Sequence, residues 1–195
     1  MMLSRTELKQ YAKMAADSFA DDPLYAALVK NRRIRKGFLY NFMYLRFYLS
    51  NTEDLMIRDS EQRGLCIWRA AANKLSVQKA LSCPRFFHLL FYTPIIIRLE
   101  RAFSQEDMSV FPANTLLLSP VFVGKKFQGK GIAKRLILEK ADALTNAGYT
   151  LGLETQNKSN LEIYTKLGFR LVKTEQCRGG KITNYLMIYA ADRDQ

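Results

Sequence analysis

The 195-residue sequence has only three cysteines and a single histidine, which leaves little for metal or disulfide chemistry. Cys66, Cys83 and Cys177 are widely spaced and form no CxxC pair, so we expect reduced thiols and no cysteine metal site. His88 has no second histidine with which to bind zinc. Its apolar neighbours favour a position on a helix face over a role as catalytic base, so the sequence predicts no bound metal.

The sequence also lacks a secretion signal and a membrane span. Charged residues interrupt the N-terminal segment, where a signal peptide needs an unbroken apolar run. The most apolar later stretch, residues 86–99, is too short to cross a bilayer and contains His88 and Pro94. We therefore expect a soluble, cytoplasmic protein with no membrane partner.

Linkers, internal repeats and low-complexity tails are missing as well, which predicts a single domain over residues 1–195. The formal net charge is +12, but the lysines and arginines are spread along the chain instead of forming one basic run. Nucleic acid, an anionic membrane surface or a phosphorylated cofactor would each suit such a charge, as would a plain solvated surface. Charge alone does not choose among them.

Apolar spacing, turn residues and prolines divide the chain into helices and strands. Ser4 and Glu7 fit a capping box that opens a first helix, which should stop before Pro23. Further helices are expected at 32–49, 129–147 and 159–167, with a helical stretch at 76–111 that is broken at Pro84 and Pro94. Strands are expected at 55–58, 64–68, 114–123, 150–155, 169–174 and 183–190. This order of elements predicts a mixed α/β fold.

The segment QGKGIA, residues 128–133, follows a strand and begins a helix. Gly129 and Gly131, with the small Ala133, let an anion approach the unpaired backbone N–H groups of a helix N-terminus. Four lysines add positive charge around the same turn: Lys125, Lys126, Lys130 and Lys134. The segment fits neither the P-loop nor the G-x-G-x-x-G fingerprint. It predicts a pyrophosphate site. The alternative is an ordinary strand–helix turn in which the glycines only supply backbone flexibility.

Two ordered motifs then point to a family. The first is Q-x-x-G-x-[G/A], met by Gln128, Gly131 and Ala133, and the second is met by Asn157, Tyr164, Gly168 and Phe169. Through these motifs, residues 116–169 resemble the GCN5-related N-acetyltransferase (GNAT) superfamily. Lys125 stands where the family's loop often carries proline, which weakens the argument for a rigid loop. The segment SFADDPLYAALV adds a weaker likeness to acetyltransferases of the puromycin N-acetyltransferase type.

The resemblance implies the GNAT fold, an α/β (α+β) architecture with a central mixed, mostly antiparallel sheet flanked by helices. It also implies acetyl-CoA as cosubstrate, with the pyrophosphate of coenzyme A in the glycine-containing loop. The backbone of Val121 and Val123 would pair with the pantetheine arm, and the Val123 N–H would be the oxyanion donor. The implied coenzyme-binding residues are Val121, Phe122, Val123, Gln128, Gly129, Lys130, Gly131, Ile132, Ala133, Lys134 and Asn157.

The resemblance assigns catalytic roles as well. Tyr164 matches the family's general acid, and a phenol with a pKa of about 10 stays protonated at neutral pH while it donates to a leaving thiolate. Glu154 ends the strand that diverges from the strand of Val123, so it is a candidate general base acting through water. Asp21 and Asp22 are the alternatives for the base.

These residues favour an enzyme that moves an acetyl group from acetyl-CoA directly to an amine. An acyl-CoA-binding regulatory module without transfer activity is the alternative, and a nucleic-acid-binding protein is a weaker third hypothesis, so we expect no nucleic-acid partner. The acceptor stays open among small amines, antibiotic-like amines, polyamines and peptide or protein amines, since a fold does not supply specificity. The identity of the base, a homodimer and the use of larger acyl groups also stay open.

Overall fold

The computed structural model of the protein describes residues 2–50, 54–71, 76–103, 107–177, 180 and 182–190. Its strands are β1 (Leu55–Arg58), β2 (Gly64–Ala70), β3 (Thr115–Val123), β4 (Thr150–Thr155), β5 (Phe169–Gln176) and β6 (Thr183–Tyr189). They form one six-stranded sheet in the order β1-β2-β3-β4-β6-β5. Among these described strands, β3 and β4 pair in parallel and all other neighbours are antiparallel. The expected mixed, mostly antiparallel sheet is therefore confirmed.

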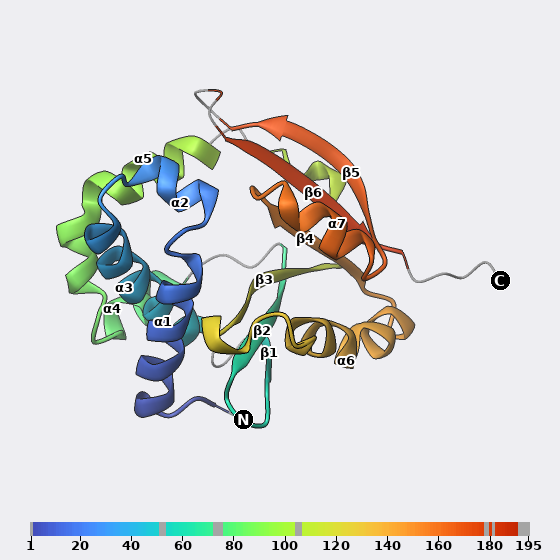
Figure 1. The fold of residues 1–195 in the computed structure, drawn as a ribbon, viewed down its shortest axis with the longest axis horizontal. Coiled ribbons are helices and arrows are strands. Elements are labelled where there is room, and N and C mark those ends of the chain that lie inside the picture. The colour runs from blue at the N-terminus through green and yellow to red at the C-terminus, as the bar shows by residue number, and fades with distance from the viewer. Residues whose placement is uncertain are drawn as a thin grey trace.

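The α-helices are α1 (Arg5–Phe19), α2 (Pro23–Leu28), α3 (Arg32–Ser50), α4 (Val77–Ser82), α5 (Thr93–Phe103), α6 (Ile132–Asn146) and α7 (Ser159–Thr165). Short 3₁₀ turns are η1 (Phe87–Tyr92), η2 (Met108–Val110) and η3 (Lys125–Phe127). Figure 1 shows α1 to α5 gathered at the left of the ribbon and α6 and α7 at the right. In the part of the chain that the structure describes, no helix combines the length and the apolarity needed to cross a membrane.

Alternate side chains of β2 show how the helices cover both faces of the sheet. Leu65 and Ile67 belong to a buried cluster with α1 and α3, whereas Cys66 and Trp68 belong to a second cluster with α6. Successive side chains of a strand point to opposite faces, so α1 and α3 cover one face and α6 covers the other. The three cysteines are buried, and none of them is in a disulfide.

Helix caps explain where the first helices begin. Ser4 Oγ accepts from the Glu7 N–H at 3.3 Å and Glu7 Oε2 accepts from the Ser4 N–H at 2.8 Å, so the predicted capping box is present in α1. The helix stops before Pro23, as predicted. The sequence prediction missed α2, which begins at that proline. Asp22 Oδ1 caps the Leu24 N–H at 3.0 Å, and proline at the first helical position needs no N–H.

Prolines also mark the breaks expected in the helical stretch 76–111. The break at Pro94 is confirmed, because η1 ends at Tyr92 and Pro94 lies in the first turn of α5, where its missing N–H costs no helical bond. The break at Pro84 is confirmed, because α4 ends two residues earlier. The predicted turn between the last two strands falls mainly on residues 178, 179 and 181, which lie outside the described residues.

Candidate active site

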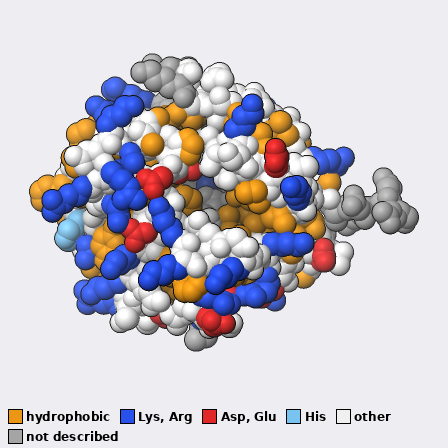
Figure 2. Space-filling view, in the orientation of Figure 1, with side chains coloured by type: hydrophobic (Ala, Val, Ile, Leu, Met, Phe, Trp, Pro, Cys, Tyr) orange, Lys and Arg blue, Asp and Glu red, His pale blue; other side chains and the backbone are white. Residues whose placement is uncertain are grey.

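The parallel strands β3 and β4 separate partway along β3. Thr115–Leu118 pair with Thr150–Leu153, whereas the rest of β3, as far as Val123, follows β2 alone. A cavity of about 310 Å³ opens at this separation and is lined from β2, β3, β4, α2, α3, α5 and α7 and by the end of α1. Figure 2 shows the surface hollowed near the centre of the face in view. The sheet therefore has an internal gap with an unpaired edge of β3 beside it.

The backbone of Val123 points away from β2 and toward this gap. The Gly124 N–H donates to Arg63 O at 2.8 Å, which makes those two residues a hydrogen-bonded pair of the antiparallel ladder. Such pairs alternate, so the neighbouring Gly64–Val123 pair exchanges no bonds and its backbone groups face outward. Val121, two residues earlier, has the same orientation. Two backbone N–H groups therefore face the gap.

The carbonyl of Val123 is held from two directions. Ser18 Oγ of α1 donates to it at 3.0 Å, and Gln128 Nε2 donates to it at 3.1 Å. The Gln128 side chain therefore fixes the end of β3. The side chains of Phe122 and Ile132 lie in the buried core. At Phe122 and Ile132, only the backbone is therefore left to face a ligand.

Gly129 and Gly131 shape the start of α6. Their φ angles of 76° and 73° are left-handed, so the helix begins at Ile132 and not at Gly129, where the sequence predicts it. Gly131 is the N-cap and supplies no side-chain cap, which leaves the first N–H groups of the helix without an intrahelical partner. A Cβ at either glycine would meet no atom within 4 Å. An anion thus has room to reach the helix N-terminus.

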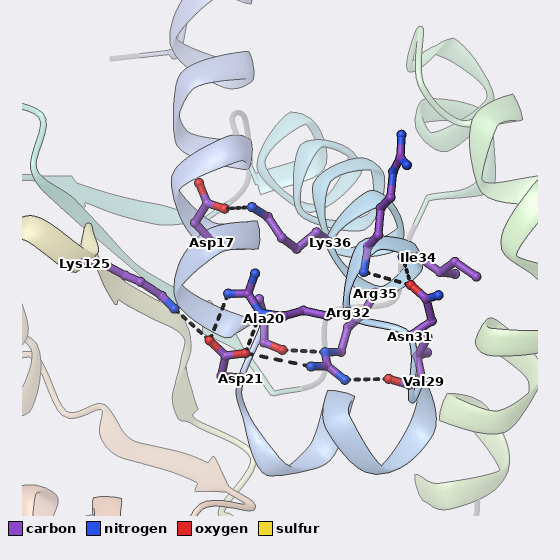
Figure 3. Close-up of polar contacts among 11 residues, drawn as sticks. Asp17, Ala20, Asp21, Val29, Asn31, Arg32, Ile34, Arg35, Lys36 and Lys125 are labelled. Carbon is purple, nitrogen blue, oxygen red and sulfur yellow. Dashed lines mark hydrogen bonds and ion pairs between the residues drawn. The ribbon is translucent and has the colours of Figure 1, made fainter.

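Ion pairs tie this loop to the region of α1, α2 and α3 (Figure 3). Lys125 Nζ lies 2.8 Å from Asp21 Oδ2, and Arg32 Nε lies 2.9 Å from Asp21 Oδ1. Hydrogen bonds from Arg32 and Lys125 hold the pKa of Asp21 well below its ordinary value. Asp21 is therefore a poor candidate for the general base. The remaining lysines of the loop are exposed: Lys126, Lys130 and Lys134.

Tyr164 lines the cavity from α7. Asn160, one helical turn earlier, and Thr155 of β4 line the same wall. Burial raises the pKa of Tyr164 to about 12, and the nearby Asp22 carboxylate adds to the shift. The phenol is therefore protonated throughout the neutral range and is available as a donor.

Two carboxylates also line the cavity. Glu154 stands where β4 leaves β3, and its Oε2 accepts from Asn184 Nδ2 at 3.2 Å. Asp22 caps α2, and burial raises the pKa of its carboxyl group. Both residues stay candidates for the base, and Glu154 is the one at the separation of the strands.

Asn157 is not among the residues that line the cavity. Its Oδ1 accepts from the Ser159 N–H at 3.1 Å, so its side chain fixes the start of the helix that carries Tyr164. Asn160 lines the cavity, and its Nδ2 donates to Thr155 Oγ1 at 3.2 Å. Sequence reasoning missed Asn160, although a spacing of four residues places it on the helix face of Tyr164.

Sequence reasoning also missed two arginines. Arg46 of α3 and Arg69 of β2 line the cavity together with Glu154. Arg69 lies on the sheet face of Leu65 and Ile67, because residues two apart in a strand point the same way. No local pattern reveals these arginines, since α3 and β2 meet only in the folded protein. The surrounding wall also includes aromatic and aliphatic side chains: Phe19, Tyr25, Phe42, Met43, Leu99 and Phe103.

A family model describes part of the chain. Residues 109–187 match the model of the acetyltransferase (GNAT) domain, a segment that runs from η2 to β6 and contains the gap, the glycine loop and Tyr164. No curated protein sequence matches the chain. The match supports the family and the enzyme class expected from the two motifs, both of which lie within the matched segment.

Solved structures with the same fold align over nearly the whole chain. One, described as histone acetyltransferase HPA2 and related acetyltransferase from Corynebacterium glutamicum, has a TM-score of 0.62 and 15% identity, covering 100% of this chain and 97% of that chain. The PaiA N-acetyltransferase of Thermoplasma acidophilum in complex with coenzyme A has a TM-score of 0.57 and 15% identity, covering 98% and 97%. The ribosomal-protein-S18-alanine N-acetyltransferase of Escherichia coli has a TM-score of 0.51 and 13% identity, covering 100% and 97%. At these identities the likeness establishes the fold.

Proposed function

We propose that the chain is an acetyltransferase of the GNAT family and that it transfers the acetyl group of acetyl-CoA directly to an amine. The observation that carries this proposal is the internal gap between β3 and β4. Two unpaired backbone N–H groups, from Val121 and Val123, face the gap, and the cavity that opens there is lined by the Tyr164 side chain. We extend the proposal to the whole chain as one domain, because all six strands belong to one sheet.

Coenzyme A would lie along the exposed edge of β3. An extended pantetheine arm finds backbone partners at Val121 and Val123, in the way an added strand pairs with a sheet edge. The pyrophosphate finds the N–H groups at the start of α6, where Gly129 and Gly131 leave the approach open. Lys130 and the other exposed lysines of the loop add positive charge at the same end.

The chemistry then follows from which groups face the gap. The amine nitrogen attacks the thioester carbonyl carbon, and the Val123 N–H stabilises the oxygen that becomes negative. The carbon–sulfur bond breaks, and the leaving sulfur takes the phenolic proton of Tyr164. Glu154 accepts the proton released by the amine through water, which balances the transfer. Since the pKa of Tyr164 is raised to about 12, the phenol keeps its proton until the thiolate forms.

One experiment tests the proposal against a regulatory module that only binds acyl-CoA. Binding of acetyl-CoA is measured by calorimetry, and release of free thiol is measured with a panel of primary amines. We expect micromolar binding, on the order of typical KM values, and thiol release that depends on the amine. Binding without amine-dependent release across the panel would favour the regulatory module, and absence of binding would defeat both hypotheses.

A further inference from the structure

Two arginines that are distant in sequence face the same cavity. Arg46 Nη2 donates to the Ser119 carbonyl at 3.0 Å and lies 3.2 Å from Ser119 Oγ. Arg69 Nε is buried and has no hydrogen-bond partner. Within the described ranges, neither guanidinium forms an ion pair with a carboxylate, although both line the cavity. The cavity therefore contains two cations that share its lining with the Glu154 carboxylate but make no ion-pair contact among the described residues.

The electrostatics of this pair are unfavourable. Burial first and the positive charge of Arg69 second lower the pKa of Arg46 to about 10, although Asp54 and Glu154 act in the opposite direction. The two cations are therefore close enough to repel each other. A buried donor without a partner is also costly. An anion between the two guanidinium groups would relieve both penalties, because arginine forms bidentate hydrogen bonds with carboxylates.

The arginines lie at the point where the chemistry is proposed. Arg69 pairs across the sheet with Leu117, and Arg46 reaches Ser119, two residues further along β3. Glu154 directly follows the last β4 residue that pairs with β3. The cationic groups and this carboxylate therefore surround one position at the separation of the strands. A ligand there meets positive and negative groups together.

The carboxylates of the cavity suit the other half of such a ligand. Glu154 Oε2 accepts from Asn184 Nδ2, and the Asp22 carboxylate accepts from the N–H groups of Leu24 and Tyr25. A carboxylate has further acceptor positions, which an amine can fill. The cavity volume of about 310 Å³ and the aromatic and aliphatic side chains in part of its wall fit a small molecule with an apolar portion.

We propose that the acceptor is a small amine that also carries a carboxylate, of the class of α-amino acids with an apolar side chain. Arg46 and Arg69 bind the carboxylate, the aromatic and aliphatic wall holds the side chain, and the amine faces Glu154. This inference rests on the proposed acetyltransferase function and names the substrate class of the same site.

The test compares acids with their amides. Thiol release at saturating acetyl-CoA is measured with leucine and leucinamide, and with phenylalanine and phenylalaninamide. The amine of an amide is less basic than that of its acid, so intrinsic reactivity at neutral pH favours the amide. We expect kcat/KM to favour the acids by about ten-fold or more, the scale of one charged hydrogen-bonded contact.

Variants then assign the preference to the arginines. Arg69→Gln should raise KM for the acids by about ten-fold and leave the amides unchanged, since the amides have no charge to lose. Arg46→Gln should act in the same direction, and thermal melting reports whether its loss of the Ser119 bonds affects the fold. Arg33→Gln, on the exposed part of the same helix, is the matched control and should change neither class.

The outcomes separate this inference from the proposed function. Equal use of acids and amides, or preference for amides, would overturn the inference and leave the acetyltransferase in place. Acetyl-CoA that binds while none of the acids is acetylated would overturn it too. If the variants slow acids and amides equally, the arginines have a structural role and do not bind the carboxylate of the acceptor. Failure to bind acetyl-CoA would instead count against the acetyltransferase itself.

Discussion

The two sides of the gap between β3 and β4 are built from different chemical groups. On the proposed coenzyme side, the groups that face the gap are backbone N–H groups of Val121, Val123 and the first turn of α6. On the proposed acceptor side they are the side chains of Arg46, Arg69 and Glu154. A backbone donor survives most substitutions, whereas a side chain is lost with a single one. Coenzyme binding should therefore depend on chain shape at a few glycines, and acceptor choice on individual side chains.

The largest effect is expected where the backbone shape itself is blocked. Gly131→Glu places a carboxylate in the open space before α6, so it should weaken coenzyme A binding by about 100-fold or more through repulsion and steric exclusion. Calorimetry measures the affinity. Gly148→Glu is the matched control, because Gly148 also has a left-handed φ, 87°, with no atom within 4 Å of a Cβ, but follows the other end of α6. Equal losses in both variants would show that backbone strain, and not the phosphate, is responsible.

Tyr164→Phe tests the boundary between the two sides. Coenzyme affinity should stay unchanged while the single-turnover rate falls by about 100-fold, the scale of general acid catalysis. The pKa of Tyr164 is raised, so ionisation of its phenol removes no activity of the native enzyme until the pH approaches about 12.

The control for Tyr164→Phe is Tyr11→Phe. Tyr11 carries a buried hydroxyl with no hydrogen-bond partner, so removing that hydroxyl should leave the rate unchanged. If the acetyl-transfer step is rate-limiting and Tyr164→Phe does not slow it, the ring has only a packing role.

Glu154→Gln tests the acceptor side, and we expect a smaller change. The amide keeps an acceptor for Asn184 but does not take up a proton, so kcat/KM should fall by about ten-fold near neutral pH. The loss should shrink as pH rises, because the amine then loses its proton to solvent. Glu162→Gln on the exposed face of α7 is the control. A loss that is constant with pH would assign Glu154 to packing or to amine binding.

The smallest effect is expected at the contact that links the two sides. Asp21→Asn frees Lys125 from its ion pair and removes a negative charge beside the loop, so coenzyme A should bind about two- to three-fold more tightly at low salt. The gain should vanish at high salt. Asp17→Asn removes the same charge from a pair with Lys36 that does not touch the loop (Figure 3). Weaker binding in Asp21→Asn alone would show that the carboxylate positions Lys125 for the ligand.

The coenzyme side could be predicted from sequence because its parts are close together in the chain. A strand end, two glycines and a helix start lie between Val121 and Ile132, and a helix N-terminus needs no side chain to attract an anion. The role of Tyr164 was predicted from a family motif. The element boundaries followed from apolar spacing, except where Gly129 and Gly131 delay the helix by adopting left-handed φ.

The acceptor side could not be predicted because its members come from separate elements. Arg46 lies in a helix whose aromatic residues dominate the pattern, and Arg69 ends an apolar strand, so neither position has a local signature. Their meeting is a property of tertiary packing. Helix α2 is a different case. Asp22 followed by Pro23 matches the N-cap and the first position of a helix, so the start of α2 was predictable from the sequence.

The gap between β3 and β4 also bears on which partners can pair with the free edge of β3. A strand edge with free N–H and C=O groups at the rim of a sheet invites pairing with another chain. Here the free edge of β3 lies in the interior of the sheet, between β2 and β4, where a second chain has no access along its length. The fold thereby leaves the unpaired backbone groups of β3 open to a slender ligand while shielding them from pairing with another chain.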